Sequence, residues 1–129
     1  MDRPYYSRVL PCGFEEGLAK LRAGLASEGL TVVSEHDMAA RFADKLGVSF
    51  PKYMVLSVCN VKVAHRVLTI DRHAGVMMPC TVVVFANAEG TTEMAIANPL
   101  LVAKALAIPE LEKIADEVLS KVLLMIEHL

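Results

Sequence analysis

The sequence predicts one α+β domain over residues 1–129, in which a mixed β-sheet of about five strands packs against helices. Three observations lead to this fold class. Short β-branched runs alternate with stretches in which apolar residues recur every three or four positions. A turn-like segment joins two neighbouring strand-like runs into a hairpin. The length of 129 residues lies close to the commonest domain size. The expected order is β-α-β-α-β-α-β-β-α-α.

The first part of the chain predicts a strand, a helix, a second strand and a second helix. Residues 5–10 (YYSRVL) form the first strand, and the helix that follows stops at Gly29. Residues 30–34 (LTVVS) are β-branched and apolar, which is typical of a strand. Asp37 is a good N-cap for the next helix, and Gly47 ends it. The helical stripes are Phe14, Leu18, Leu21 and Leu25 in the first helix and Met38, Phe42 and Leu46 in the second.

The middle of the chain predicts a strand, a helix and another strand. Residues 53–59 (YMVLSVC) are almost continuously apolar, which indicates a central strand buried on both faces. Asn60 is a good N-cap for the helix behind it, and residues 81–86 (TVVVFA) form the following strand. Because a helix links the two strands, we expect them to pair in parallel. The stripe of this helix consists of Val61, Ala64, Val67 and Leu68.

The last part of the chain predicts a hairpin and two helices. The turn at residues 87–90 (NAEG) leads into a strand, and a short helix runs from Pro99 to about Ala107. Pro109 stands at the first position of a long final helix, with two glutamates behind it. Residues 122–126 (VLLMI) are apolar all round, so we expect them to cover another subunit or a neighbouring helix. The expected inner face is Leu111, Ile114, Ala115, Val118, Leu119, Val122 and Ile126.

Composition excludes several classes of partner. The formal net charge is −2 and no Lys/Arg cluster occurs, so we expect neither nucleic-acid binding nor polybasic attachment to a membrane. The N-terminus has an acidic second residue and no apolar signal segment, and three cysteines without disulfide spacing suit a reducing compartment. We therefore expect a cytoplasmic protein.

The apolar share of 54% and the mean hydropathy of +0.44 are high for a small chain, which favours a homodimer.

Cys59 is the first candidate site residue, because it ends a strand and precedes the start of a helix. Backbone N–H groups and the helix dipole at such a position stabilise a thiolate. The alternative is that Cys59 is a small buried apolar residue, and burial statistics favour this alternative. Cys80 starts the strand that follows Pro79. Parallel pairing of the two strands would place Cys59 and Cys80 far apart, so no disulfide between them is expected.

The sequence assigns no metal ligands, cofactor or catalytic residue. His65 and His73 lie between the two cysteines, but neither a CxxC nor an HxxxH pair occurs, so the zinc signatures are absent. A discontinuous metal site stays open as a minor alternative. Met77 and Met78 suggest soft-metal binding, although adaptable core filling is the better interpretation. The phosphate-binding and hydrolase motifs GxGxxG, GxxxxGK[ST] and GxSxG are also absent.

Several segments together resemble one known family. They are KYMVLSVCN, AHRVL, AGVMMPCTVVVF, NPLLVAKAL and PELEKIADEV, with the early segment FEEGLAKLRAGLASEGLTVVSEHDMAARFADKLGV. The chain resembles the family called domain of unknown function 302 over almost its whole length. That family has a Cys-Asn pair at a strand end and a Gly-x-x-x-Pro-Cys segment before a valine-rich strand. Val61 and Asn98 depart from it, since the family often has Pro and Asp at these positions.

The resemblance implies a small α+β domain that commonly dimerises, with no established activity. Its signature falls on Cys59, Asn60, Gly75, Pro79 and Cys80, and a need for positive φ or close packing at Gly75 would explain that glycine structurally. With His65, these residues are the candidate ligand-binding set. We expect a homodimeric domain that binds a small molecule, a metal or a sulfur species near the Cys59–Asn60 turn. The alternatives are a structural or interaction module with packing cysteines and, behind it, a thiol-dependent redox enzyme.

Overall fold

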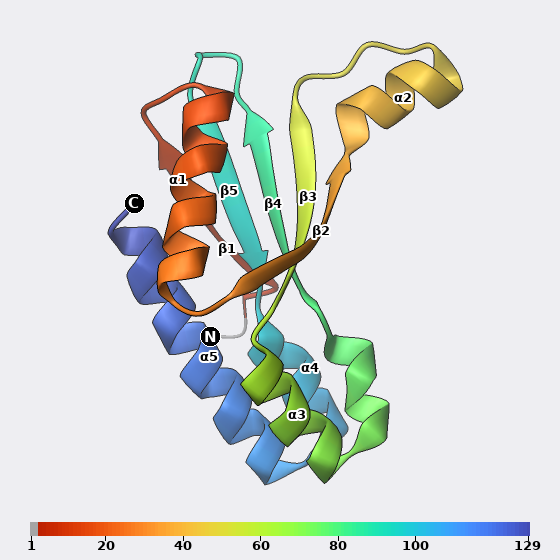
Figure 1. The fold of residues 1–129 in the computed structure, drawn as a ribbon, viewed down its shortest axis with the longest axis vertical. Helices are drawn as coiled ribbons and strands as arrows, with labels where there is room; N and C mark the ends of the chain where they lie inside the picture. Colours follow the sequence, from red (N-terminus) through yellow and green to blue (C-terminus); the bar gives the residue numbers. More distant parts are fainter. Residues whose placement is uncertain (1–2) are drawn as a thin grey trace.

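The computed structural model describes residues 3–129 and confirms the α+β class and the order of the predicted elements. The acidic second residue, on which the signal-segment argument relied, lies outside this range. One further element, a short 3₁₀-helix, was not predicted. The elements are β1 (Tyr5–Leu10), α1 (Phe14–Ser27), β2 (Thr31–Asp37), α2 (Met38–Leu46), β3 (Tyr53–Cys59), α3 (Val61–Ile70), the 3₁₀-helix η1 (Arg72–Met77), β4 (Cys80–Ala86), β5 (Thr92–Ala97), α4 (Pro99–Leu106) and α5 (Pro109–Glu127) (Figure 1).

The five strands form one sheet in the order β1-β5-β4-β3-β2, and every neighbouring pair is antiparallel. The expected mixed sheet is therefore wrong, as is the parallel pairing of β3 with β4. The crossover rule applies when a helix carries the chain back along the sheet. Here α3 and η1 lie beyond the end of the sheet (Figure 1), so the chain re-enters the sheet at the end where it left. Antiparallel pairing follows from that return.

The predicted caps explain where several helices begin and end. The Asp37 side chain accepts a hydrogen bond from the Ala40 N–H at 2.9 Å, which starts α2. Gly47 ends the same helix in the left-handed region at φ 65°, where a glycine has no steric penalty. Asn98 accepts from the Leu100 N–H at 3.0 Å and starts α4. Pro109 opens α5 at a position that needs no backbone donor.

The apolar side chains gather in two clusters. The sheet cluster lies between the strands and the helices α1 and α5, whereas the helix cluster joins α3, α4, η1 and the first half of α5. Val118 packs against both clusters. The sheet cluster includes Leu21, Leu25, Leu56, Val58, Val82, Val84, Met94 and Ile126, and the helix cluster includes Val67, Ala74, Ala103, Leu111, Ile114 and Ala115.

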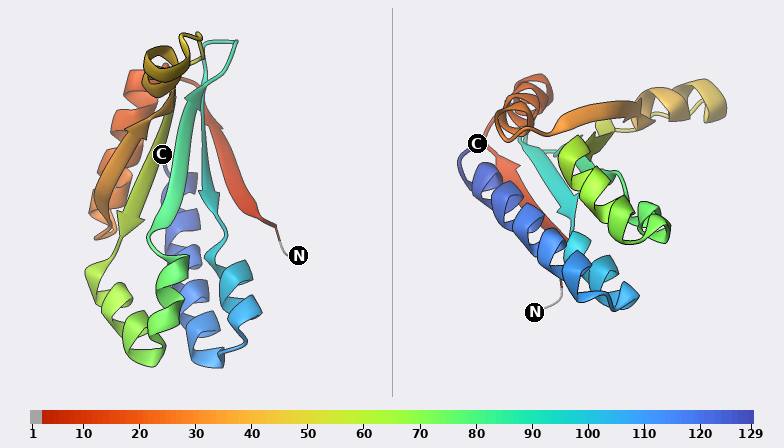
Figure 2. Two further views of the ribbon diagram at one scale, coloured as in Figure 1. Left: turned by 90° about the vertical axis from the view of Figure 1, so that its right-hand side faces the viewer. Right: turned by 60° about the horizontal axis from the view of Figure 1, so that its bottom comes forward.

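The prediction that β3 is buried on both faces is wrong. Only Leu56 and Val58 of this strand are buried, and both belong to the sheet cluster. Figure 2 (left) shows why, since α1 and α5 lie behind the sheet while its other face carries no helix along most of its length. Part of that face is covered by aromatic side chains, among them Tyr53 and Phe85, whose rings stack at 5.4 Å.

Helix α2 projects from the end of the sheet, away from the other helices (Figures 1 and 2). Its apolar stripe is amphipathic as predicted, but none of its residues is buried. Leu46 is 68% exposed, and Phe50 in the following loop is 47% exposed. Phe50 makes an edge contact with Phe42 at 5.1 Å between ring centroids. An exposed apolar surface outside the two clusters therefore lies on α2 and the loop that follows it.

Helix α5 is the element that holds both clusters together. In its apolar tail Val122, Met125 and Ile126 are buried against the sheet cluster, while Leu124 is 57% exposed. Of the two expected roles for this tail, covering a neighbouring helix is confirmed, because the tail packs on α1. Arg8 of β1 donates a hydrogen bond to the Ile126 carbonyl and ties the tail to the sheet edge. Among residues 3–129, no helix has both the length and the apolar content needed to cross a bilayer.

Candidate functional site

A small apolar cavity lies between the two clusters, where the end of the sheet meets α3, η1 and α5. Its volume is about 70 Å³, counted as the space open to the centre of a water molecule. We call it the seam cavity. A void is expected there because two separately packed clusters meet at this point and their side chains do not interlock fully. The lining residues are Leu30, Val58, Cys59, Asn60, Val63, Ala64, Val67, Met77, Met78, Pro79, Cys80, Pro99, Leu111, Ile114, Ala115 and Val118.

Antiparallel pairing brings Cys59 and Cys80 to the same end of the sheet. Val58 is the direct partner of Cys80, so Cys59 lies one residue beyond that pair. The expectation that the two cysteines lie far apart is wrong, because it depended on parallel pairing. All three cysteines are free thiols, and all three are half-buried. Two of the three therefore line one cavity from neighbouring strands.

The protonation of Cys80 is controlled by its surroundings. Burial raises the pKa of the Cys80 thiol, and the nearby Cys59 raises it further through charge repulsion. Apart from the two cysteines, none of the described residues that line the seam cavity has a titratable side chain. A thiol in this position stays protonated and neutral near neutral pH, so Cys80 is a poor nucleophile.

Asn60 is confirmed as the N-cap of α3, and this role occupies its side-chain oxygen. The Oδ1 atom accepts hydrogen bonds from the Lys62 N–H at 3.0 Å and from the Val63 N–H at 3.3 Å. Only the Nδ2 group remains free to face a ligand. The predicted stripe of α3 was partly wrong, because Val61 is 73% exposed and Val63 points inward instead. Val63, Ala64 and Val67 form the wall that α3 contributes to the cavity.

Two of the six candidate residues lie outside the seam cavity. His65 is exposed and lines a surface groove with Glu110 and Lys113. Gly75 lies in η1, does not have a positive φ, and a Cβ added to it would meet only Leu68 Cδ2 at an ordinary 3.5 Å. Neither structural reason suggested for this glycine applies. The structure thus brings together Cys59, Asn60, Pro79 and Cys80.

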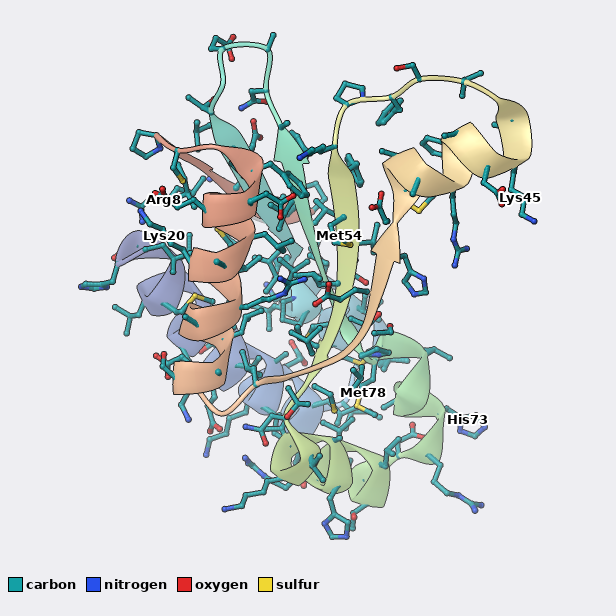
Figure 3. All side chains as sticks on the ribbon, turned by 45° about the horizontal axis from the view of Figure 1, so that its top comes forward. Arg8, Lys20, Lys45, Met54, His73 and Met78 are labelled. Atoms are coloured by element: carbon teal, nitrogen blue, oxygen red, sulfur yellow. The ribbon has the colours of Figure 1, made fainter. Side chains whose placement is uncertain are left out.

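The two methionines before Pro79 were judged to be core filler, and both do pack against the helix cluster. They also line the seam cavity, which was not predicted. Figure 3 shows Met78 between the end of the sheet and η1, whereas His73 projects outward and its side chain is 94% exposed. The sequence Met-Met-Pro-Cys at residues 77–80 could have indicated that the methionines lie beside Cys80. The inner face of α5 was predicted, but its part as the opposite wall of a cavity was not.

Among residues 3–129, no group of three or more His, Cys, Asp or Glu side chains is placed to hold an ion. The zinc-type site that the sequence left open as a minor alternative therefore has no support in this part of the chain.

Comparisons with known proteins agree with the resemblance. The family model for "Domain of unknown function DUF302" matches residues 6–129. A solved structure, "uncharacterized conserved protein DUF302" from Bacillus stearothermophilus, is similar with a TM-score of 0.90 and 25% sequence identity, over 98% of this chain and 98% of that one. No curated protein matches the sequence. Since the family model covers nearly every residue, the chain belongs to the family of domain of unknown function DUF302.

Proposed function

We propose that this protein is a small-ligand-binding module whose site is the seam cavity beneath the Cys59–Asn60 turn. One observation carries the proposal. Four candidate residues chosen from the sequence line a single cavity, although they come from two strands and the connections beside them. Cavities with apolar walls and a few polar groups are the usual form of small-molecule sites.

The size and chemistry of the cavity limit its ligand. A volume of about 70 Å³ admits a ligand of only a few non-hydrogen atoms. The lining residues are apolar except for two cysteines and Asn60, so a hydrated ion or a carboxylate would lose more hydration than the walls return. The expected ligand is therefore small, and it is either apolar or thiophilic.

Binding is favoured over thiol catalysis. A catalytic thiol is usually activated by a neighbouring base or cation, and a helix N-terminus alone offers no acceptor for the thiol proton. Among residues 3–129, no histidine, lysine, arginine or carboxylate lines the seam cavity, and the Cys80 thiol is kept protonated by burial. The redox-enzyme alternative lacks the groups that it requires.

The test is the reaction of folded protein with methyl methanethiosulfonate, a small neutral thiol reagent, followed by peptide mass spectrometry. We expect the thiols of both Cys59 and Cys80 to react in the folded state, and Cys80 to react more slowly because burial keeps its thiol protonated. The Ala64→Leu variant fills the cavity from α3, and we expect it to slow both reactions at least tenfold. Cys12, which packs against the sheet cluster outside the cavity, is the internal reference. Ala105→Leu, on an exposed position of α4, is the matched control. Equal rates in the Ala64→Leu variant and the unmodified protein would contradict the proposal.

Native mass spectrometry complements this test. Protein purified without chelator or reductant is compared with its Cys59→Ser variant. Retained mass that is lost in the variant supports a ligand at the seam cavity and reports the ligand's size. The same spectra report the number of subunits.

A second candidate function is self-association, and the projecting helix α2 favours it. The apolar stripe of α2 is only partly covered by its own chain, because Met38 and Phe42 are half-buried whereas Leu46 and the neighbouring Phe50 are exposed. A net charge of −2 gives little repulsion between two copies, and the high apolar share favours pairing with an identical surface. We therefore propose a homodimer that buries α2.

Sedimentation velocity tests this arrangement. We expect Leu46→Lys to convert dimer to monomer, and Leu124→Lys, at an exposed position on α5, to leave the dimer intact. A monomeric unmodified protein at micromolar concentration would contradict the proposal. Dissociation by Leu124→Lys alone would move the interface from α2 to α5.

A further inference from the structure

We propose that the seam cavity is a site for a soft monovalent metal ion of the Cu(I) or Ag(I) type, bound by cysteine sulfur with methionine thioether support. This inference rests on the proposed function, because it names the ligand class of the same cavity. It adds Met77 and Met78 to the site and assigns them a chemical role.

The convergence of sulfur is the first argument. The chain has three cysteines and seven methionines, and Cys59, Met77, Met78 and Cys80 all line this one cavity. They come from the end of β3, from the end of η1 and the residue after it, and from the start of β4. Four of the ten sulfur-bearing residues of the chain are thus among the sixteen residues that line this cavity. Apolar filling alone would be served as well by leucine or valine.

The kind of donor selects the kind of ion. Thiolate and thioether sulfur are soft ligands that prefer Cu(I) and similar ions, whereas carboxylate and carbonyl oxygen suit Mg²⁺, Ca²⁺ and Mn²⁺. Within the described part of the chain, no carboxylate or imidazole lines the seam cavity. Structural zinc takes four cysteine or histidine ligands, and only two cysteines are available here.

Charge balance is the third argument. A monovalent ion bound to one thiolate is electrically neutral, and the other three donors can remain a neutral thiol and neutral thioethers. A divalent ion with the same donors would leave a net positive charge among apolar side chains, which is costly. In the binding step, Cu⁺ leaves its carrier chelator, a copper–sulfur bond forms at one cysteine, and the thiol proton passes to solvent. No electron is transferred.

The experiment is an anaerobic titration of the full chain with Cu(I) bicinchoninate, in which loss of the coloured chelate reports transfer to the protein. We expect one Cu(I) per chain. The Cys80→Ser variant should lose binding, and the Met77→Leu/Met78→Leu double variant, which keeps the apolar packing, should bind at least tenfold more weakly. Cys12→Ala and Met38→Leu, both outside the cavity, should bind as the unmodified protein does. Copper X-ray absorption should show sulfur scatterers only.

Three outcomes would overturn the inference. The first is no transfer of Cu(I) to the unmodified protein. The second is an unchanged affinity for Cu(I) in the Met77→Leu/Met78→Leu variant, after circular dichroism has verified that this variant is folded. The third is competition by Zn²⁺ with equal affinity. If Cu(I) does not bind while methyl methanethiosulfonate still reaches Cys59 and Cys80, only the ligand class is wrong. If neither reaches the cysteines, the binding cavity itself is wrong.

Discussion

Replacing Asn60 with alanine tests how the site is built, because Asn60 both caps α3 and lines the seam cavity. Its Oδ1 atom accepts hydrogen bonds from two backbone donors, at 3.0 Å and 3.3 Å. Helix α3 has ten residues, and only Val67 among them is buried. A helix this short is marginal by itself, so its cap contributes a large share of its stability.

The geometry sets the size of the effect. The Lys62 N–H is exposed and the Val63 N–H is half-buried, so water replaces part of what the side chain supplied. The loss is therefore about 1 kcal/mol, the usual value for an N-cap, and smaller than that for two fully buried donors left unpaired. For a chain of 129 residues this corresponds to a fall in Tm of about 3–5 °C.

Urea denaturation of Asn60→Ala and Asn60→Ser measures the effect. Serine is nearly as good an N-cap as asparagine and is also neutral, so we expect the serine variant to keep most of the free energy of unfolding. Equal loss in both variants would refute the capping argument and would mean that the amide acts through the cavity wall. An alanine variant as stable as the unmodified protein would refute it as well.

Three further predictions concern packing, backbone and pH. Gly17→Ala should lower the free energy of unfolding by about 1–3 kcal/mol in urea denaturation, because the new Cβ would lie 2.8 Å from Cγ2 of the fully buried Thr92. A higher free energy of unfolding would mean that β5 shifts easily to make room for the methyl group. Ala107→Gly should raise the stability by up to about 1 kcal/mol, since Ala107 has φ 57°, and a lower Tm would contradict this reasoning. The third prediction follows from the raised pKa of Cys80 in the metal-free folded state. The unfolded thiol ionises first, so stability should fall as the pH rises above about 9.0, and this fall should be smaller in Cys80→Ala. Identical pH profiles of the two proteins would count against that assignment.

Local chemistry made the elements predictable. Asp37, Asn60 and Asn98 each cap the helix that follows them, and Gly47 ends α2 in the left-handed region. The predicted bounds of β1, β3, α4 and α5 agree with the structure to within a residue or two, because caps, prolines and periodicity act over a few neighbouring residues. The cysteines were chosen as candidates for the same local reason, since Cys59 stands at the junction of a strand and a helix.

Pairing and packing were decided by the tertiary structure. The direction of β4 depends on the path that α3 and η1 take between the two strands, and no residue in β3 or β4 encodes that path. Parallel pairing would have placed Cys80 at the far end of the sheet. The antiparallel pairing of the structure places it at the same end as Cys59. The exposure of α2 likewise depends on its position beyond the sheet, although its apolar stripe was correct.

The sequence by itself therefore determined the helices and strands other than η1, their order, several helix caps and the short set of residues around Cys59 and Cys80 that line the cavity. Only the tertiary structure decided that Met77 and Met78 join them, that His65 and Gly75 do not, and that α5 closes the opposite wall. The physical reason is the distance along the chain over which each kind of interaction acts. Capping and periodicity act between residues a few positions apart, whereas a cavity forms where two clusters of side chains, distant in the chain, meet without filling the space between them.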